Sequence, residues 1–127
     1  MEELGKVPVV VRLDVPGFVV NRLQYALLRE AYALVDAGVC SFEDVDRAVT
    51  AGLGARWAAL GPFETMDLAG LDVHAAVAEN LWPELATTNK PPRSIEAARE
   101  RGSIRAGFDA EELKARRDRV LRLLREG

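Results

Sequence analysis

The stretch PGFVVNRLQYALLREAYALV, Pro16–Val35, carries the strongest structural signal in this chain of 127 residues. Its apolar residues recur at helical spacing, and Gly38 follows at a place that suits a helix end, so we predict one helix over residues 17–37. A narrow polar stripe, spaced by seven residues, consists of Arg22, Arg29 and Asp36. The remaining apolar arc spans roughly 200°, twice that of an ordinary surface helix. We therefore expect this helix to be buried on two sides, against its own domain and against a partner.

Asn21 stands near the start of this predicted helix, between Leu28 and Tyr32 on the apolar arc. An amide left unpaired in such surroundings costs ~1–3 kcal/mol, so some group must form a hydrogen bond with it. A backbone carbonyl or a buried water would do so without any functional role. A ligand group that reaches the helix start from a neighbouring domain is the other interpretation, and helical geometry alone leaves both open.

Composition indicates a single domain that folds without disulfides. Apolar residues make up 49% of the chain and charged residues 29%, as in ordinary globular domains. Cys40 is the only cysteine, so we expect it to pack as a small hydrophobe in a reducing compartment, without a metal. No apolar run reaches the ~18 residues of a membrane span, and the opening MEELGK is acidic where a signal peptide is basic. We therefore expect a cytoplasmic protein with no membrane partner.

Start and stop signals along the chain predict an all-α fold of about five or six helices. Helix starts are indicated by Ser41, Pro62 and Asp109, and helix ends by Pro83 and Gly102. A short helix is expected over Ser94–Arg101, and Gly52 and Gly54 are expected to loosen the end of the second helix.

One β-strand is predicted before the helices, over VPVVVRL, Val7–Leu13, because this segment is short and β-branched. A lone strand cannot satisfy its backbone donors and acceptors within its own segment. It therefore needs a neighbour, either in a sheet that these residues do not supply or in a second chain.

Basic residues gather at the C-terminal end of the chain. Residues 89–127 carry 11 Lys+Arg against 7 Asp+Glu, whereas residues 1–88 carry 6 against 13. The segment KARRDRVLRLLREG has an apolar stripe at helical spacing and no aromatic residue for base stacking. We expect a solvated amphipathic helix docked on the domain, and no nucleic-acid partner.

Two quoted segments resemble the C-terminal domain of the 3-hydroxyacyl-CoA dehydrogenase family. They are GKVPVVVRLDVPGFVVNRLQYALLREAYALVDAGVCSFEDVDRAV and GPFETMDLAGLDV, and the likeness covers residues 5–73. GLGARWAALGPFETM is more similar to the L-gulonate 3-dehydrogenase (lambda-crystallin) branch, and DLAGLD to the hydroxyacyl-CoA branch. The substrate branch is therefore ambiguous between a sugar acid and an acyl-CoA.

The resemblance implies a helical domain, like the C-terminal domain of 6-phosphogluconate dehydrogenase, that dimerises and closes a substrate cleft. In such enzymes an N-terminal Rossmann domain binds NAD and carries the catalytic His–Glu pair, which takes the proton of a 3-hydroxyacyl-CoA or 3-hydroxyacid. Asn21 matches the asparagine that faces this pair, and Arg56 matches an arginine implicated in substrate binding. A guanidinium suits a carboxylate, although an ordinary surface role for Arg56 is an even alternative.

The cofactor site that the resemblance implies is not found among these residues. GLGARW, Gly52–Trp57, has a tryptophan where the dinucleotide fingerprint needs its third glycine, and a helix is predicted before it. His74 falls within a predicted helix and does not match the catalytic histidine. We therefore expect residues 1–13 to be the last strand of a Rossmann domain, residues 14–127 to be the helical domain, and NAD not to bind this chain alone. A non-catalytic helical dimerisation module is the alternative function.

Overall fold

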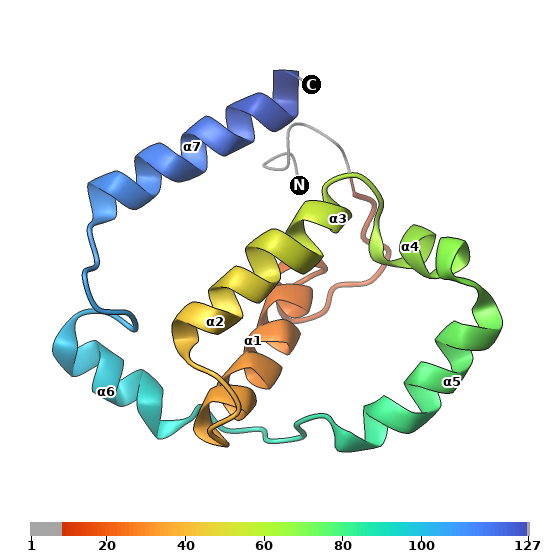
Figure 1. Cartoon of the computed structure of the whole chain (residues 1–127), viewed down its shortest axis with the longest axis horizontal. Helices are drawn as coiled ribbons and strands as arrows, with labels where there is room; N and C mark the ends of the chain where they lie inside the picture. The colour runs from red at the N-terminus through yellow and green to blue at the C-terminus, as the bar shows by residue number, and fades with distance from the viewer. Residues whose placement is uncertain (1–8, 127) are drawn as a thin grey trace. The chain divides into compact units, whose positions relative to one another are not determined.

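The computed structural model describes residues 9–126, and every regular element in this part of the chain is helical (Figure 1). The helices are α1 (Val20–Asp36), α2 (Phe42–Arg47), α3 (Ala55–Trp57), α4 (Pro62–Ala69), α5 (Leu71–Leu81), α6 (Arg93–Arg101) and α7 (Ala110–Glu126). The all-α prediction is confirmed. Two compact units are present, one from Met1–Leu28 with Gly107–Gly127 and the other from Arg29–Ala106, and each is described here by itself.

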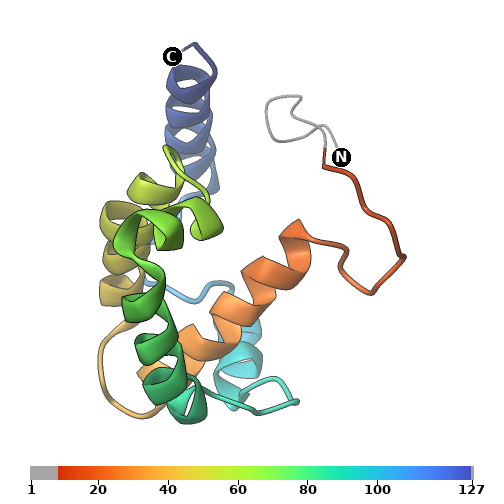
Figure 2. The same ribbon diagram turned by 90° about the vertical axis from the view of Figure 1, so that its right-hand side faces the viewer.

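Only part of the predicted strand lies among the residues that the structure describes. Val7 and Pro8 lie outside the described residues, and residues 9–13 run as extended coil before α1 without strand pairing (Figure 2). Val10 is 82% exposed. A strand needs a hydrogen-bonded neighbour, so the pairing of this segment with a Rossmann sheet stays a prediction.

Ser41 begins α2 as its sequence predicts. The Ser41 Oγ accepts a hydrogen bond from the Asp44 amide at 3.1 Å, which satisfies one of the free donors of the first turn. A hydrogen bond with the Ser41 side chain, together with Arg47 at 2.8 Å, lowers the pKa of Asp44 below its ordinary value.

A π-helical segment, η1 (Ala48–Gly54), follows α2 directly and leads without a break into α3. The prediction that Gly52 and Gly54 loosen the helix end is therefore wrong, because the helix continues through both and only widens. The Thr50 hydroxyl donates to the carbonyl of Asp46 at 2.8 Å, where the helix changes width. If α2, η1 and α3 are counted as one element, the described residues form six helices.

Helix α4 starts at Pro62, where the Glu64 Oε1 accepts from the Gly61 amide at 3.0 Å. Gly70, with φ of 103°, separates α4 from α5. A short 3-10 turn at Trp82–Glu84 extends α5, and the following loop leads to α6 (Figure 2).

Two contacts connect different elements of the second unit. The Tyr32 and Phe42 rings pack edge to face, with centroids 6.0 Å apart. The Glu30 Oε1 accepts a hydrogen bond from the Ala86 amide at 2.7 Å, which attaches the loop after α5 to α1.

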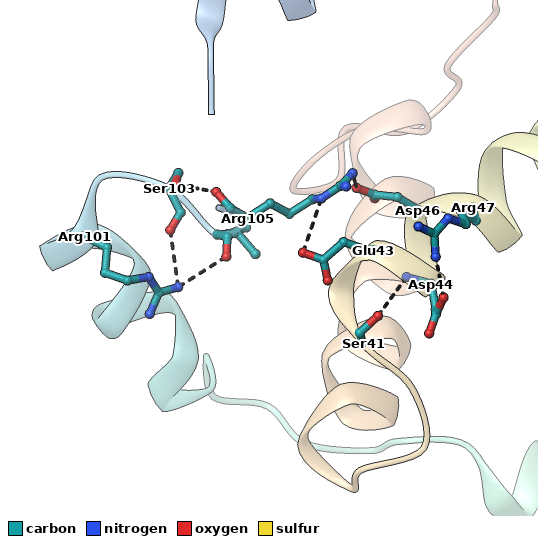
Figure 3. Close-up of polar contacts among 9 residues, drawn as sticks. Ser41, Glu43, Asp44, Asp46, Arg47, Arg101, Ser103 and Arg105 are labelled. Atoms are coloured by element: carbon teal, nitrogen blue, oxygen red, sulfur yellow. Dashed lines mark hydrogen bonds and ion pairs between the residues drawn. The ribbon is translucent and has the colours of Figure 1, made fainter. Parts of the chain in front are cut away.

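A third connection joins the segment after α6 to α2 (Figure 3). Arg105 forms an ion pair with Asp46 at 2.8 Å and lies 3.7 Å from a carboxylate oxygen of Glu43. Its backbone carbonyl accepts from the Ser103 hydroxyl at 2.7 Å, and Arg101 donates to the Ser103 carbonyl at 3.3 Å. The turn that carries Arg105 is therefore closed by its own side chains.

Helix α7 begins at the predicted place. The Asp109 Oδ1 accepts from the amides of Glu111 and Glu112 at 3.1 and 3.2 Å. Its apolar stripe is exposed and consists of Leu113, Val120, Leu121 and Leu124. The docking of this helix on the domain stays a prediction.

Little apolar surface is buried within the part of the chain that the structure describes. Ala98, at 7% exposed, is its one buried hydrophobic side chain. Phe63 of α4 and Trp82 after α5 are 85% and 68% exposed. A lone domain of this length ordinarily buries many such side chains, so these surfaces are typical of a domain that is covered by other protein.

Candidate functional site

The segment before α1 makes a tight turn with two consecutive residues in the left-handed region. Gly17 has φ of 83° and Phe18 has φ of 51°, and the Phe18 amide donates to the Val15 carbonyl at 3.0 Å. A left-handed Phe is uncommon because its Cβ crowds the backbone, and such residues concentrate at functional sites.

Arg22 closes this turn from the first turn of α1. Its Nη1 donates to the carbonyl of Pro16 at 3.1 Å. A Cβ built on Gly17 would lie 3.0 Å from the Cγ of Arg22, so the glycine also leaves room for the arginine stem. The motif residues Pro16, Gly17 and Arg22 therefore support one another. The sequence placed Arg22 on a polar stripe but carried no signal for this hydrogen bond.

Asn21 is the second residue of α1, directly before Arg22, and its side chain is exposed. Within residues 9–126 its amide has no hydrogen-bond partner. Leu23 and Tyr25, on the same part of the helix, are each 63% exposed. The expected burial of the amide is therefore not found within the part of the chain that the structure describes. The Asn21 amide is instead free to pair with a group from outside.

Arg56 belongs to α3, directly after the π-helical segment, and is exposed. Its side chain forms no ion pair or hydrogen bond with the other residues that the structure describes. Its guanidinium therefore keeps all five donors available, in the planar fork that matches a carboxylate. Asn21 and Arg56 fall in different units, and each site is described by itself.

The segment Gly52–Trp57 does not form a dinucleotide-binding loop. Gly52, Gly54 and Trp57 lie within a continuous helix, so their amides are not presented by a strand-to-helix loop. His74 lies half-buried in α5. Residues 9–126 also contain no group of three or more His, Cys, Asp or Glu side chains that could hold a metal ion. None of their helices is long and apolar enough to cross a membrane.

Comparison with known proteins gives a family match and several relatives. Residues 17–108 match the family described as 3-hydroxyacyl-CoA dehydrogenase, C-terminal domain. The 5-formyl-3-hydroxy-2-methylpyridine 4-carboxylate 5-dehydrogenase of Mesorhizobium japonicum is 48% identical over 86 residues, which are 68% of this chain and 28% of that protein. A lambda-crystallin homolog of Mus musculus is 38% identical over 124 residues, which are 92% of this chain and 39% of that protein.

A solved structure shares the fold. The crystal structure of 5-formyl-3-hydroxy-2-methylpyridine 4-carboxylic acid 5-dehydrogenase, described as an NAD+-dependent dismutase, matches with a TM-score of 0.80 and 36% identity. The match covers 96% of this chain and 42% of that one, so the chain spans less than half the length of these relatives. The chain belongs to the 3-hydroxyacyl-CoA dehydrogenase family and corresponds to the C-terminal domain of these NAD-dependent, 3-hydroxyacyl-CoA dehydrogenase-like enzymes.

Proposed function

We propose that this chain supplies the dimer interface and part of the substrate cleft of an NAD-dependent dehydrogenase that acts on a 3-hydroxyacyl-CoA or a 3-hydroxyacid. The observation that carries the proposal is the family match over residues 17–108, in a chain that covers 28%, 39% and 42% of the three longer relatives described above. The dinucleotide and the residues that exchange the proton then belong to a Rossmann domain outside these 127 residues.

Asn21 faces the substrate in this proposal. Its exposure, its unpaired amide and the closed turn beside it support this role. An amide is not a proton-transfer group at neutral pH, but it donates and accepts hydrogen bonds at once. Asn21 therefore orients the reacting hydroxyl or the catalytic groups, which is a contribution of preorganisation.

Arg56 binds an anionic group of the substrate. Its free guanidinium supports this role, as does the name of one relative, which acts on a pyridine 4-carboxylate. Loss of a charge-assisted hydrogen bond costs ~1.5–3 kcal/mol, which is about tenfold or more in affinity. The equally weighted alternative is that Arg56 is an ordinary solvent-exposed residue without a role in binding. That alternative predicts that Arg56→Ala leaves KM unchanged.

A replacement of Asn21 tests the catalytic assignment. In the complex of this chain with its nucleotide-binding domain, Asn21→Ala should lower kcat by about 10²-fold, the usual effect of losing one oriented hydrogen bond. Asn80→Ala is the matched control, because the Asn80 amide donates only to the Ala76 carbonyl of its own helix, at 2.8 Å. An unchanged kcat for Asn21→Ala would remove this residue from the site.

Nucleotide binding by the separate chain is a second test. Isothermal titration calorimetry of the 127-residue chain with NAD should give no saturable heat. Saturable binding would contradict the assignment of the cofactor to another domain.

The second candidate function, a helical association module without catalysis, is favoured by the exposed apolar surface. Phe63, Trp82 and Leu68 are 85%, 68% and 78% exposed, and a homodimer interface or the Rossmann domain would cover such side chains. Sedimentation equilibrium at about 10–50 µM should show a dimer, since obligate interfaces of this kind persist at micromolar concentration. Phe63→Ser should weaken that dimer.

The two candidates differ in one result. Dehydrogenase activity after addition of the cognate Rossmann domain supports the enzyme, and a dimer without any activity supports the module. A monomer would contradict the association that both candidates require.

A further inference from the structure

We propose that Gly54 is a positioning residue for Arg56, because the π-helical segment that ends at Gly54 sets the direction in which the guanidinium points. This inference rests on the role of Arg56 given above and adds the backbone feature that orients its side chain. Wide turns of this type occur frequently at functional sites.

Gly54 is needed for the wide turn because of one backbone contact. A Cβ built on Gly54 would lie 2.9 Å from the carbonyl oxygen of Val49, five residues earlier. This contact is with backbone, so no side-chain rotation can relieve it. The φ and ψ of Gly54 are −62° and −42°, which any residue adopts, so its conformational freedom is not the reason for the glycine.

Gly52 lies in the same segment and provides an internal control. A Cβ built there meets no atom within 4 Å. A methyl group at residue 52 is therefore accommodated, and a methyl group at residue 54 forces the Val49 carbonyl to move.

A movement of that carbonyl changes where Arg56 points. A π turn contains one more residue than an α turn, so its conversion to α-helix rotates the following residues by about 100° around the axis. Arg56 follows Gly54 by two residues, and its side chain forms no ion pair or hydrogen bond with another described residue that would hold its direction. The helix backbone therefore sets the direction in which the Arg56 side chain leaves the helix.

Thr50 contributes to the same turn from its other end. Its hydroxyl donates to the Asp46 carbonyl at 2.8 Å, the acceptor at the point where α2 changes into the wide turn. Thr50→Val removes this donor at nearly constant shape, and Thr50→Ser keeps it.

The first measurement compares crystal structures of the 127-residue chain with Gly54→Ala and with Gly52→Ala. We expect Gly54→Ala to shift the Val49 carbonyl and rotate Arg56, and Gly52→Ala to change neither. A Gly54→Ala variant that keeps the wide turn and the direction of Arg56 overturns the proposal. If Gly54→Ala fails to fold, Thr50→Val against Thr50→Ser is the substitute pair with the same expected contrast.

The second measurement is steady-state kinetics of the complex with the nucleotide-binding domain. Gly54→Ala should raise KM by about tenfold or more, as Arg56→Ala does, with kcat within about twofold. The double variant Gly54→Ala with Arg56→Ala should be no worse than Arg56→Ala alone, because both changes remove the same interaction. Additive effects would mean that Gly54 acts only on stability and would overturn the proposal.

The outcomes separate this inference from the proposed function. If Arg56→Ala raises KM but Gly54→Ala behaves as Gly52→Ala, the function stands and the positioning role fails. If Arg56→Ala leaves KM unchanged, the substrate role of Arg56 fails, and the positioning role fails with it.

Discussion

Replacement of Arg105 by methionine tests how the segment after α6 is attached to α2. The guanidinium forms an ion pair with Asp46 at 2.8 Å and lies 3.7 Å from Glu43, and the partners of the first pair are 59 residues apart. Methionine keeps the length and the apolar stem of the side chain, so the substitution removes mainly the charge and its hydrogen bond.

The expected loss follows from the geometry and the exposure of the pair. The Arg105 and Asp46 side chains are 45% and 57% exposed, so solvent screens their attraction. Pairs of this kind contribute ~0.2–1 kcal/mol, and the second carboxylate brings the expected loss to about 1 kcal/mol. With an unfolding entropy of ~2.1 cal/mol/K per residue, this loss lowers the Tm by about 4 °C.

Thermal unfolding by circular dichroism, with urea titration at 25 °C, measures the effect. The matched control is Arg47→Met, which breaks a local pair with Asp44 inside α2 that is 75% and 55% exposed. That exposed local pair should contribute less to stability than the long-range pair does. In 1 M salt the Debye length falls to ~3 Å, and the difference between Arg105→Met and the wild type should shrink by about half or more.

A double-mutant cycle with Asp46→Asn isolates the pair. A coupling energy near zero, or an equal loss for Arg47→Met, would refute the reasoning, because it would mean that this long-range contact has no more effect than a local one.

Two further predictions concern single hydroxyl groups. Ser94→Ala should leave stability unchanged or raise it by about 1 kcal/mol in urea unfolding, because the Ser94 hydroxyl is buried without a hydrogen-bond partner in the described structure; a loss of more than that amount would contradict this. Ser41→Ala should raise the pKa of Asp44 toward its ordinary value of 3.8 in an NMR titration. Because the pKa of Asp44 is lowered in the folded state, the Ser41 contact stabilises the fold at a pH above the ordinary pKa of Asp44. This stabilisation is lost as the pH falls through the lowered pKa of the folded state. An unchanged pKa in Ser41→Ala would refute the assigned cause.

Helix starts and ends were predictable from the sequence because their signals are local. Ser41 and Asp109 accept hydrogen bonds from amides two or three residues ahead, and Gly102 adopts the left-handed conformation that ends α6. Each of these signals acts within one helical turn. The helical class of the domain followed from them and from the spacing of apolar residues.

The candidate site was predictable only through resemblance. The motifs that resemble the family point to Asn21 and Arg56, and the roles of both residues stay predictions. The exposure of Asn21 contradicted the burial that the apolar arc implied, because the surface that would cover α1 does not come from the described part of this chain. Periodicity identifies an apolar face but not which molecule covers it.

The sequence by itself determined which segments are helical and where each begins, because capping and side-chain spacing are properties of neighbouring residues. Only the tertiary structure decided that Arg105 pairs with Asp46, that Arg22 closes the turn before α1, and that the helix widens before Gly54. The physical reason is that these features depend on atoms brought together by the path of the backbone. The spacing of residues in the sequence gives no sign that a Cβ at residue 54 would meet the Val49 carbonyl. It also gives no sign that the Arg105 guanidinium reaches a carboxylate 59 residues away.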